Sequence, residues 1–141
     1  MVDGAEIGGE QPPRRIITPQ RAVALVYVVA MFMNVMDTQI VNVAIPSLIR
    51  DFHTTTGSVQ WVITAYVMAI AVAVPASGWI GDRFGTKKIM MIAVGSFTAA
   101  SALCARSTSL DELIATRILQ GIGGGMMVPV GMAMLYRAYP P

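Results

Sequence analysis

Four long apolar stretches alternate with short polar segments along the chain. Residues 54–81 and 89–105 carry no formal charge, residues 22–49 carry one acid, and residues 113–136 carry one base. A helix needs about 20 mostly apolar residues, at about 1.5 Å each, to cross a hydrocarbon core about 30 Å thick. The pattern therefore predicts an all-α membrane protein with four transmembrane helices. They are expected at about residues 22–48, 57–80, 89–106 and 112–136.

Composition supports this assignment. The 141 residues are 55% hydrophobic and 13% charged, with a mean hydropathy of +0.61, whereas soluble domains carry about 25% charged residues. The net charge of +2 does not indicate a nucleic-acid partner, because the bases lie at the ends of the predicted helices rather than on one soluble face.

The distribution of bases predicts the orientation. Short loops on the cytoplasmic side of a membrane are enriched in Lys and Arg. One side would carry seven bases: Arg14, Arg15, Arg21, Arg83, Lys87, Lys88 and Arg137. The other side would carry only Arg50 and Arg106. Both termini are therefore expected in the cytoplasm. Residues 1–20 are expected to form a flexible cytoplasmic tail, and residues 21–141 a transmembrane bundle.

Asp37 lies near the middle of the first predicted helix. A carboxylate at that depth costs about 2.5–3.5 kcal/mol on insertion scales, so it must face a cavity or a partner. Arg117, in the fourth predicted helix, is the candidate partner. At about 1.5 Å per residue, Asp37 lies about 3 Å and Arg117 about 10 Å to the outer side of the midplane. An arginine side chain can bridge that offset. Asp37 is either a proton carrier or a structural acid, and Arg117 either pairs with it or extends to the outer interface.

Small residues follow Arg117 in the fourth predicted helix. Gly121 and Gly125 form a GxxxG pair, which allows two helices to approach closely. Gln120 and Gly123 lie in the same glycine-rich segment. We expect these four residues to serve helix packing.

The segment from Gly78 to Lys88 joins the second and third predicted helices as a tight hairpin, with Gly85 in the turn. Lys87 and Lys88 are explained by orientation alone. Asp82 is not, because it is an acid at a basic surface. It could reach the start of a neighbouring helix or a base elsewhere in the bundle, and so hold one conformation as a latch.

This hairpin resembles the cytoplasmic signature between the second and third helices of the major facilitator superfamily. The matching residues are Gly78, Asp82, Arg83, Gly85 and Lys87. Thr86 stands where the family usually has a base. In the fourth helix, Arg117, Gln120, Gly121 and Gly123 match a second signature of the superfamily. In the first helix, Asp37, Asn42 and Pro46 match the signature of its fourteen-span drug:proton antiporter group, with Gln39 in place of a threonine.

The resemblance implies a proton-coupled multidrug exporter, not an enzyme, of which this chain is the N-terminal part. Its four helices would begin a six-helix N-terminal bundle. Asp37 and Arg117 would belong to proton coupling, and the 78–88 hairpin to a gate between inward-open and outward-open states. The implied partners are the lipid bilayer of the cell membrane, protons, an amphipathic small-molecule substrate and the remaining C-terminal spans. No cofactor or metal is implied, since the proton gradient supplies the energy.

Three alternatives remain open at this point. The chain could be a complete four-helix small multidrug transporter, since such proteins also carry an acid in the first helix. It could be a truncated membrane or assembly subunit that transports nothing. It could also belong to an exporter of nutrients or metabolites in the same superfamily.

Overall fold

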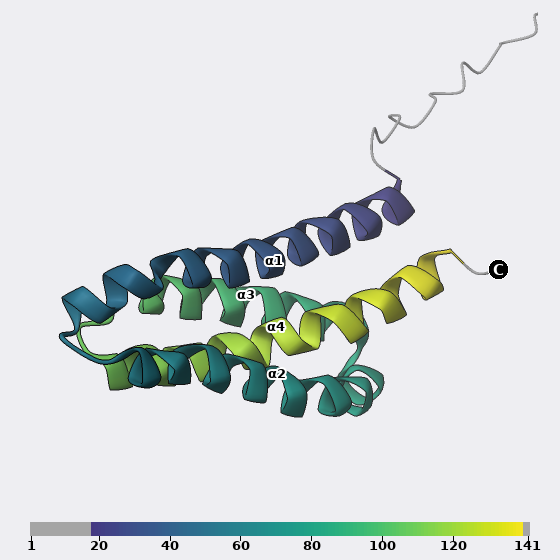
Figure 1. Ribbon diagram of the computed structural model, residues 1–141. Helices are drawn as coiled ribbons and strands as arrows, with labels where there is room; N and C mark the ends of the chain where they lie inside the picture. The colour runs from purple at the N-terminus through teal and green to yellow at the C-terminus, as the bar shows by residue number, and fades with distance from the viewer. Residues whose placement is uncertain (1–17, 140–141) are drawn as a thin grey trace, which may run out of the picture.

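The computed structural model describes residues 18–139, which form four α-helices and no strand (Figure 1). The helices are α1 (Pro19–Asp51), α2 (Thr56–Phe84), α3 (Thr86–Cys104) and α4 (Leu110–Ala138). Each is long and apolar enough to cross a membrane. The predicted all-α, four-helix membrane architecture is therefore confirmed. Of the predicted tail, residues 1–17 lie outside the described part, and Pro19 and Gln20 already belong to α1.

Hydroxyl side chains cap three of the helices. Thr18, Thr55 and Ser109 each accept a hydrogen bond from the backbone N–H three residues later, which satisfies one of the free donors of a first helical turn. At α4, the Glu112 carboxylate also accepts from the backbone N–H and hydroxyl of Thr108. This reciprocal arrangement is close to a capping box and fixes where α4 begins.

Gly85 alone links α2 to α3. Its φ of +89° lies in a region that residues with a side chain rarely adopt. The chain therefore reverses within a single residue. Asp82 and Arg83 lie in the last turn of α2, and Lys87 and Lys88 in the first turn of α3. The hairpin predicted from sequence thus places its charges on helix ends rather than in a loop.

Helix α1 differs from expectation near its end. The first helix was predicted to end at about residue 48, but α1 continues to Asp51, with Pro46 inside it. Pro46 is exposed on the outer surface of the bundle. A proline within a helix removes one backbone hydrogen bond, and in a membrane helix the freed carbonyl can be satisfied by local adjustments.

Helix α4 is the central element and packs mainly against α2 and α3, and less extensively against α1 (Figure 1). Helices α1 and α3 barely touch each other. The beginning of α1, the α2–α3 link and the end of α4 lie at one end of the bundle, and the other two links lie at the opposite end (Figure 1).

The glycines of α4 explain its central position, because they point at different neighbours. A Cβ atom at Gly121 would lie 2.6 Å from the backbone oxygen of Tyr66 in α2. A Cβ atom at Gly123 would lie 2.9 Å from the backbone oxygen of Ala93 in α3. Gly125 also faces α2, and Gly124 faces Asn34 of α1. Close packing at these positions leaves no room for a side chain.

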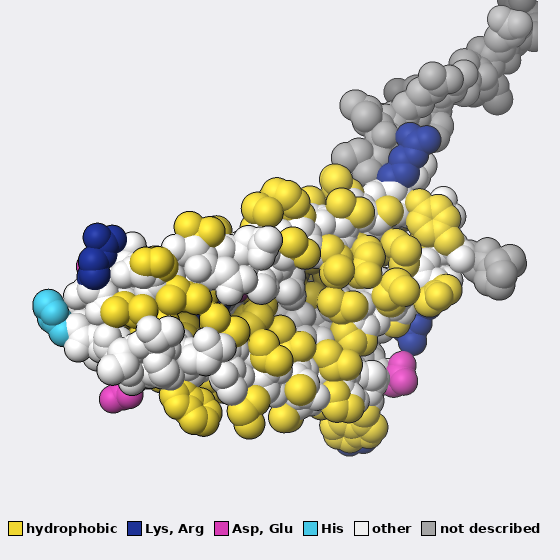
Figure 2. Space-filling model, in the orientation of Figure 1, with side chains coloured by type: hydrophobic (Ala, Val, Ile, Leu, Met, Phe, Trp, Pro, Cys, Tyr) yellow, Lys and Arg dark blue, Asp and Glu magenta, His cyan; other side chains and the backbone are white. Residues whose placement is uncertain are grey.

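The surface of the bundle is apolar, unlike that of a soluble protein, and a few polar side chains are buried inside it. Yellow hydrophobic side chains cover much of the visible surface between the two ends (Figure 2), and Val43 and Val72 are 81% and 73% exposed. The buried residues include Ser77, Arg117 and Gln120. Lipid-facing helices have this pattern, because polar side chains are stable in a membrane only when they face the protein interior.

Candidate functional site

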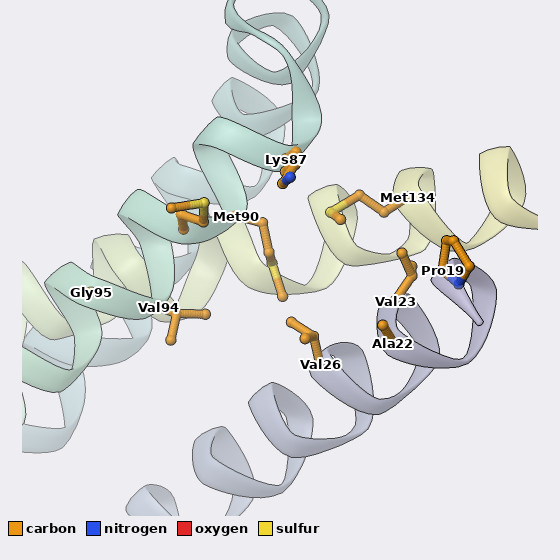
Figure 3. Close-up of a pocket in the computed structure, with 10 residues that line it drawn as sticks. Pro19, Ala22, Val23, Val26, Lys87, Met90, Val94, Gly95 and Met134 are labelled. Atoms are coloured by element: carbon orange, nitrogen blue, oxygen red, sulfur yellow. The ribbon is translucent and has the colours of Figure 1, made fainter. Parts of the chain in front are cut away.

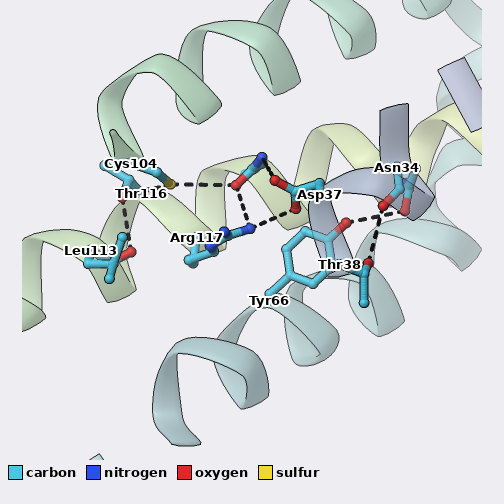
Figure 4. A network of polar contacts seen from close by, with 9 residues as sticks. Asn34, Asp37, Thr38, Tyr66, Cys104, Leu113, Thr116 and Arg117 are labelled. Atoms are coloured by element: carbon cyan, nitrogen blue, oxygen red, sulfur yellow. Dashed lines mark hydrogen bonds and ion pairs between the residues drawn. The ribbon is translucent and has the colours of Figure 1, made fainter. Parts of the chain in front are cut away.

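Asp37, Arg117 and Gln120 form a closed triangle of polar contacts between α1 and α4 (Figure 4). Arg117 Nη1 donates to Asp37 Oδ2 at 2.7 Å and to Gln120 Oε1 at 2.9 Å. Gln120 Nε2 donates to Asp37 Oδ1 at 2.7 Å. The side chains of Asp37 and Arg117 are only 11% and 8% exposed. The structure thus brings together the two charges whose difference in depth an arginine side chain was expected to bridge.

The helical repeat of α4 explains this geometry. Residues three apart lie on the same face of a helix, so Arg117 and Gln120 both face α1, where Asp37 lies. The two carboxylate oxygens of Asp37 each accept one hydrogen bond. An ionised carboxylate accepts at both oxygens, whereas a protonated carboxyl carries a donor on one of them. A proton on Asp37 would remove its negative charge and place a donor on one of these two oxygens.

Cys104, in α3, contacts the Gln120 side chain of this triangle. Its Sγ donates to Gln120 Oε1 at 3.5 Å and lies 3.2 Å from Thr116 Oγ1. Because the amide oxygen of Gln120 faces two donors, Arg117 and Cys104, its amino group is directed at Asp37. The amide orientation is thus fixed by contacts from two helices.

The ring of Tyr66, in α2, packs against the guanidinium group of Arg117. The guanidinium carbon is 5.7 Å from the centre of the Tyr66 ring, within the range of a cation–π interaction. The Tyr66 hydroxyl donates to Asn34 Oδ1 at 3.2 Å, and Asn34 Nδ2 donates to the backbone oxygen of Gly124 at 3.3 Å. This network joins α1, α2 and α4. Within residues 18–139, the buried Nε of Arg117 has no hydrogen-bond partner.

A second polar cluster lies at the end where α2 and α3 meet. Arg137 Nη2 at the end of α4 lies 3.4 Å from Asp82 Oδ1, and Arg137 Nη1 lies 3.5 Å from Thr86 Oγ1. The side chains of Arg137 and Asp82 are 62% and 78% exposed. Asp82 thus contacts a base elsewhere in the bundle, which was one of its two expected partners. An exposed pair of this length is weak and easily exchanged.

Arg83 and Gly78 of the 78–88 hairpin are exposed, whereas Gly81 and Thr86 are buried. Arg83 lies over the rings of Trp79 and Phe84, at 5.6 and 6.0 Å from their centres. A side chain added at Gly78 would meet nothing within 4 Å, so packing among the described residues does not require a glycine there.

Comparison with known proteins identifies the family. The sequence model of the Major Facilitator Superfamily matches residues 27–141. The chain belongs to the major facilitator superfamily. It is 48% identical over 109 residues to a protein of Pectobacterium carotovorum subsp. carotovorum (strain PC1) with the provisional name multidrug resistance protein MdtD. Proteins of the same name from Serratia proteamaculans (strain 568) and Yersinia pestis (strain Pestoides F) are 48% and 46% identical.

Each of these matches covers 77% of this chain and 23% of the relative. The chain therefore spans about a quarter of the length of the curated relatives that it matches. Membership of the superfamily confirms the resemblance inferred from the three sequence signatures. It also identifies the chain as part of a transporter family.

Some of the predicted site residues lie in the polar network between α1 and α4, and others lie outside it. Asp37, Arg117 and Gln120 are brought together, although Gln120 was expected only as a packing residue. Asn42 is exposed but borders a small cavity of about 20 Å³ that Tyr66 and Arg117 also line. Pro46 does not join the site.

The network also contains Tyr66, Cys104 and Thr116, which were not among the residues predicted for the site. A signal for Tyr66 was present, because a hydroxyl in the middle of an uncharged membrane helix needs a hydrogen-bond partner. Cys104 gave no such signal, since a cysteine in an apolar helix behaves as a small hydrophobic residue.

Proposed function

We propose that this chain is part of a proton-coupled antiporter that exports drugs or other amphipathic small molecules across the cell membrane. Membership of a transporter superfamily supports transport, and the names of its relatives support multidrug export. The observation that carries the coupling proposal is the buried 2.7 Å ion pair between Asp37 and Arg117. An ionisable residue inside a membrane helix marks a proton or substrate pathway by default.

In the proposed cycle, a proton neutralises Asp37. The neutral carboxyl loses its ion pair with Arg117, and one of its oxygens becomes a donor instead of an acceptor. Arg117 keeps its charge and is left buried with only Gln120 and the Tyr66 ring. Because an unpaired buried charge is strongly destabilising, the position of α1 against α4 changes. The transporter then favours its other state, and the substrate and the proton move in opposite directions.

The two ends of the bundle have different roles in this proposal. The end with Arg21, Arg83, Lys87, Lys88 and Arg137 faces the cytoplasm, together with the N-terminus. There, Asp82 and Arg137 act as a latch of the 78–88 gate. A weak exposed pair suits that role, since a latch has to open at each cycle. The remaining spans of the longer protein complete the bundle and the substrate cavity.

Dye efflux from cells tests the proposed function. The protein is expressed at its natural length in an efflux-deficient bacterial strain loaded with ethidium. We expect energised efflux that a protonophore abolishes. Efflux is expected to be lost in Asp37→Asn and retained in the matched control Asp51→Asn, because Asp51 is exposed at the end of α1. Efflux of ethidium that persists after the proton gradient is collapsed would contradict proton coupling. Failure to export ethidium, or any other dye tested in the same way, would contradict multidrug export.

A further inference from the structure

The contact between Tyr66 and Arg117 lies inside the bundle (Figure 4). Both residues are buried. None of the residues in the polar network lines the groove of about 740 Å³ that opens between α1 and α3 (Figure 3). The contact is therefore made among the described helices and does not depend on what covers that groove.

Arg117 uses a single nitrogen, Nη1, for its hydrogen bonds to Asp37 and Gln120. The second carboxylate oxygen of Asp37 accepts from Gln120 instead, so the ion pair is not bidentate. The guanidinium carbon also lies over the Tyr66 ring, 5.7 Å from its centre. Of these three neighbours, only Asp37 has a charge that a proton removes. The ring contact is the same whether or not Asp37 carries a proton, provided that the ring stays in place.

The position of the Tyr66 ring does not depend on Asp37. The Tyr66 hydroxyl donates to Asn34 Oδ1 at 3.2 Å. A Cβ atom at Gly124 would lie 3.3 Å from this hydroxyl, and one at Gly121 would lie 2.6 Å from the backbone oxygen of Tyr66. The glycines of α4 thus allow α2 to approach and leave room for the ring. None of these three contacts involves the Asp37 carboxylate.

We propose that Tyr66 is a positioning residue for proton coupling, and that its ring holds Arg117 in place while Asp37 is protonated. This inference rests on the proposed function of Asp37. A guanidinium group paired with a carboxylate presents little net charge to an aromatic ring. When Asp37 is neutral, the full charge faces the ring in a desolvated setting, where a cation–π contact is strongest. The ring therefore stabilises the protonated site more than the ionised site, and only such a difference can shift the equilibrium between two states.

A double-mutant cycle on the protein at its natural length tests this contact without measuring transport. Asp37→Asn represents the protonated carboxyl, because it is neutral and has one acceptor oxygen and one donor group. Tyr66→Leu removes the ring. We expect it to raise the unfolding equilibrium constant about tenfold more in the Asp37→Asn protein than in the unmodified protein, the difference between a desolvated and a charge-compensated cation–π contact. The control Tyr136→Leu removes an exposed ring at the end of α4 and is expected to have the same effect in both proteins.

Fluorinated phenylalanines at position 66 separate the electrostatic role of the ring from its packing. Each fluorine withdraws electron density from the ring face and weakens its attraction for a cation, while the size of the ring changes little. In the Asp37→Asn protein, the unfolding equilibrium constant is expected to rise about tenfold from Tyr66→Phe to the trifluorinated ring, against about twofold or less in the protein that retains Asp37. Proton-driven efflux of ethidium is expected to fall along the same series. Tyr66→Phe keeps the ring and is expected to keep most of the efflux that Tyr66→Leu loses.

Three results would overturn the inference. The first is an equal effect of Tyr66→Leu in the unmodified and the Asp37→Asn proteins, which would show that the ring only packs. The second is a fluorinated series that leaves the stability of the Asp37→Asn protein unchanged. The third is proton-driven efflux that is equal along the series. Failure of the proposed function is distinguishable from all three, because it would appear as missing proton-driven efflux in the unmodified protein, whereas the stability measurements involve no transport.

Discussion

Asp37 accepts hydrogen bonds from two residues on one face of α4, Arg117 and Gln120. These contacts determine how substitutions in the triangle are expected to change the stability of the protein. The attraction between Asp37 and Arg117 opposes the penalty of removing both charges from water. For buried pairs these effects often nearly cancel, so the pair itself is weak evidence for stability. Removal of one partner is different, because it leaves the other charge buried and unpaired. The residue-scale predictions rest on this asymmetry.

The first prediction concerns the ion pair. Arg117→Met alone and Asp37→Leu alone are each expected to destabilise the protein by about 3–5 kcal/mol, because each leaves an uncompensated buried charge. The double variant Asp37→Leu/Arg117→Met is expected to be much more stable than the sum of the two effects. Denaturant-induced unfolding in detergent, followed by tryptophan fluorescence, measures this. Additive destabilisation would show that the pair does not form.

The second prediction concerns Gln120. Gln120→Leu removes the donor to Asp37 Oδ1 and an acceptor of Arg117. It is expected to destabilise the protein by about 1–3 kcal/mol, the penalty for leaving buried polar groups without partners. The control Gln60→Leu changes an exposed residue of α2 and is expected to have little effect. Equal unfolding midpoints for the two variants would exclude a structural role for the Gln120 hydrogen bonds.

Helix α4 sets the arrangement of elements, because its glycines allow three neighbours to approach it. Gly121 and Gly123 face different helices, so a single GxxxG pair does not describe the packing. Sequence could predict that α4 packs closely. It could not predict which glycine faces which helix, since that depends on the rotation of each helix about its axis.

A third prediction follows from these contacts. Gly121→Ala is expected to destabilise the bundle by about 1–3 kcal/mol, since the added methyl overlaps the backbone of α2. Gly95→Ala is the matched control in α3, where the added methyl meets nothing within 4 Å. It is expected to be neutral or to stabilise by up to about 1 kcal/mol, because alanine favours the helix. Thermal unfolding of both variants in one detergent compares them, and a Gly121→Ala variant as stable as Gly95→Ala would contradict the close approach of α4 to α2.

The helices were predictable because charged residues are excluded from the hydrocarbon core, which leaves four uncharged or nearly uncharged stretches. Their ends were less predictable. Helices α1, α2 and α4 continue past the predicted ends into charged residues such as Arg83 and Arg137, since a helix can extend into the headgroup region. The contact between Asp37 and Arg117 was predictable because a charge in a membrane demands a partner. Tyr66 and Cys104 carry no charge, so Tyr66 had only a weak signal in the sequence, through its hydroxyl, and Cys104 had none.

At the scale of the whole molecule, the proposed orientation in the membrane rests on the unequal number of bases at the two ends of the bundle. Five bases of the described residues lie at the end that holds the α2–α3 link: Arg21, Arg83, Lys87, Lys88 and Arg137. Arg50 and Arg106 lie at the other end. The surface between the two ends is largely apolar.

The fourth prediction tests this orientation. In a Cys104→Ser background, a cysteine placed at Arg106 is expected to react with a membrane-impermeant maleimide in intact cells. A cysteine placed at Lys88 is expected to react only after the membrane is permeabilised. Both positions are exposed, so a difference in labelling reports the side of the membrane. The reverse labelling pattern would contradict a cytoplasmic N-terminus.

Proton movement in proteoliposomes tests the central claim most directly, namely that Asp37 couples transport to protons. The protein at its natural length is reconstituted with a pH-sensitive dye inside, and substrate is added across an imposed pH gradient. We expect substrate-driven proton flux in the unmodified protein and in Asp51→Asn. In Asp37→Asn, we expect no proton flux, while exchange of labelled for unlabelled substrate continues without a gradient. Proton flux in Asp37→Asn equal to that of the unmodified protein would contradict the claim.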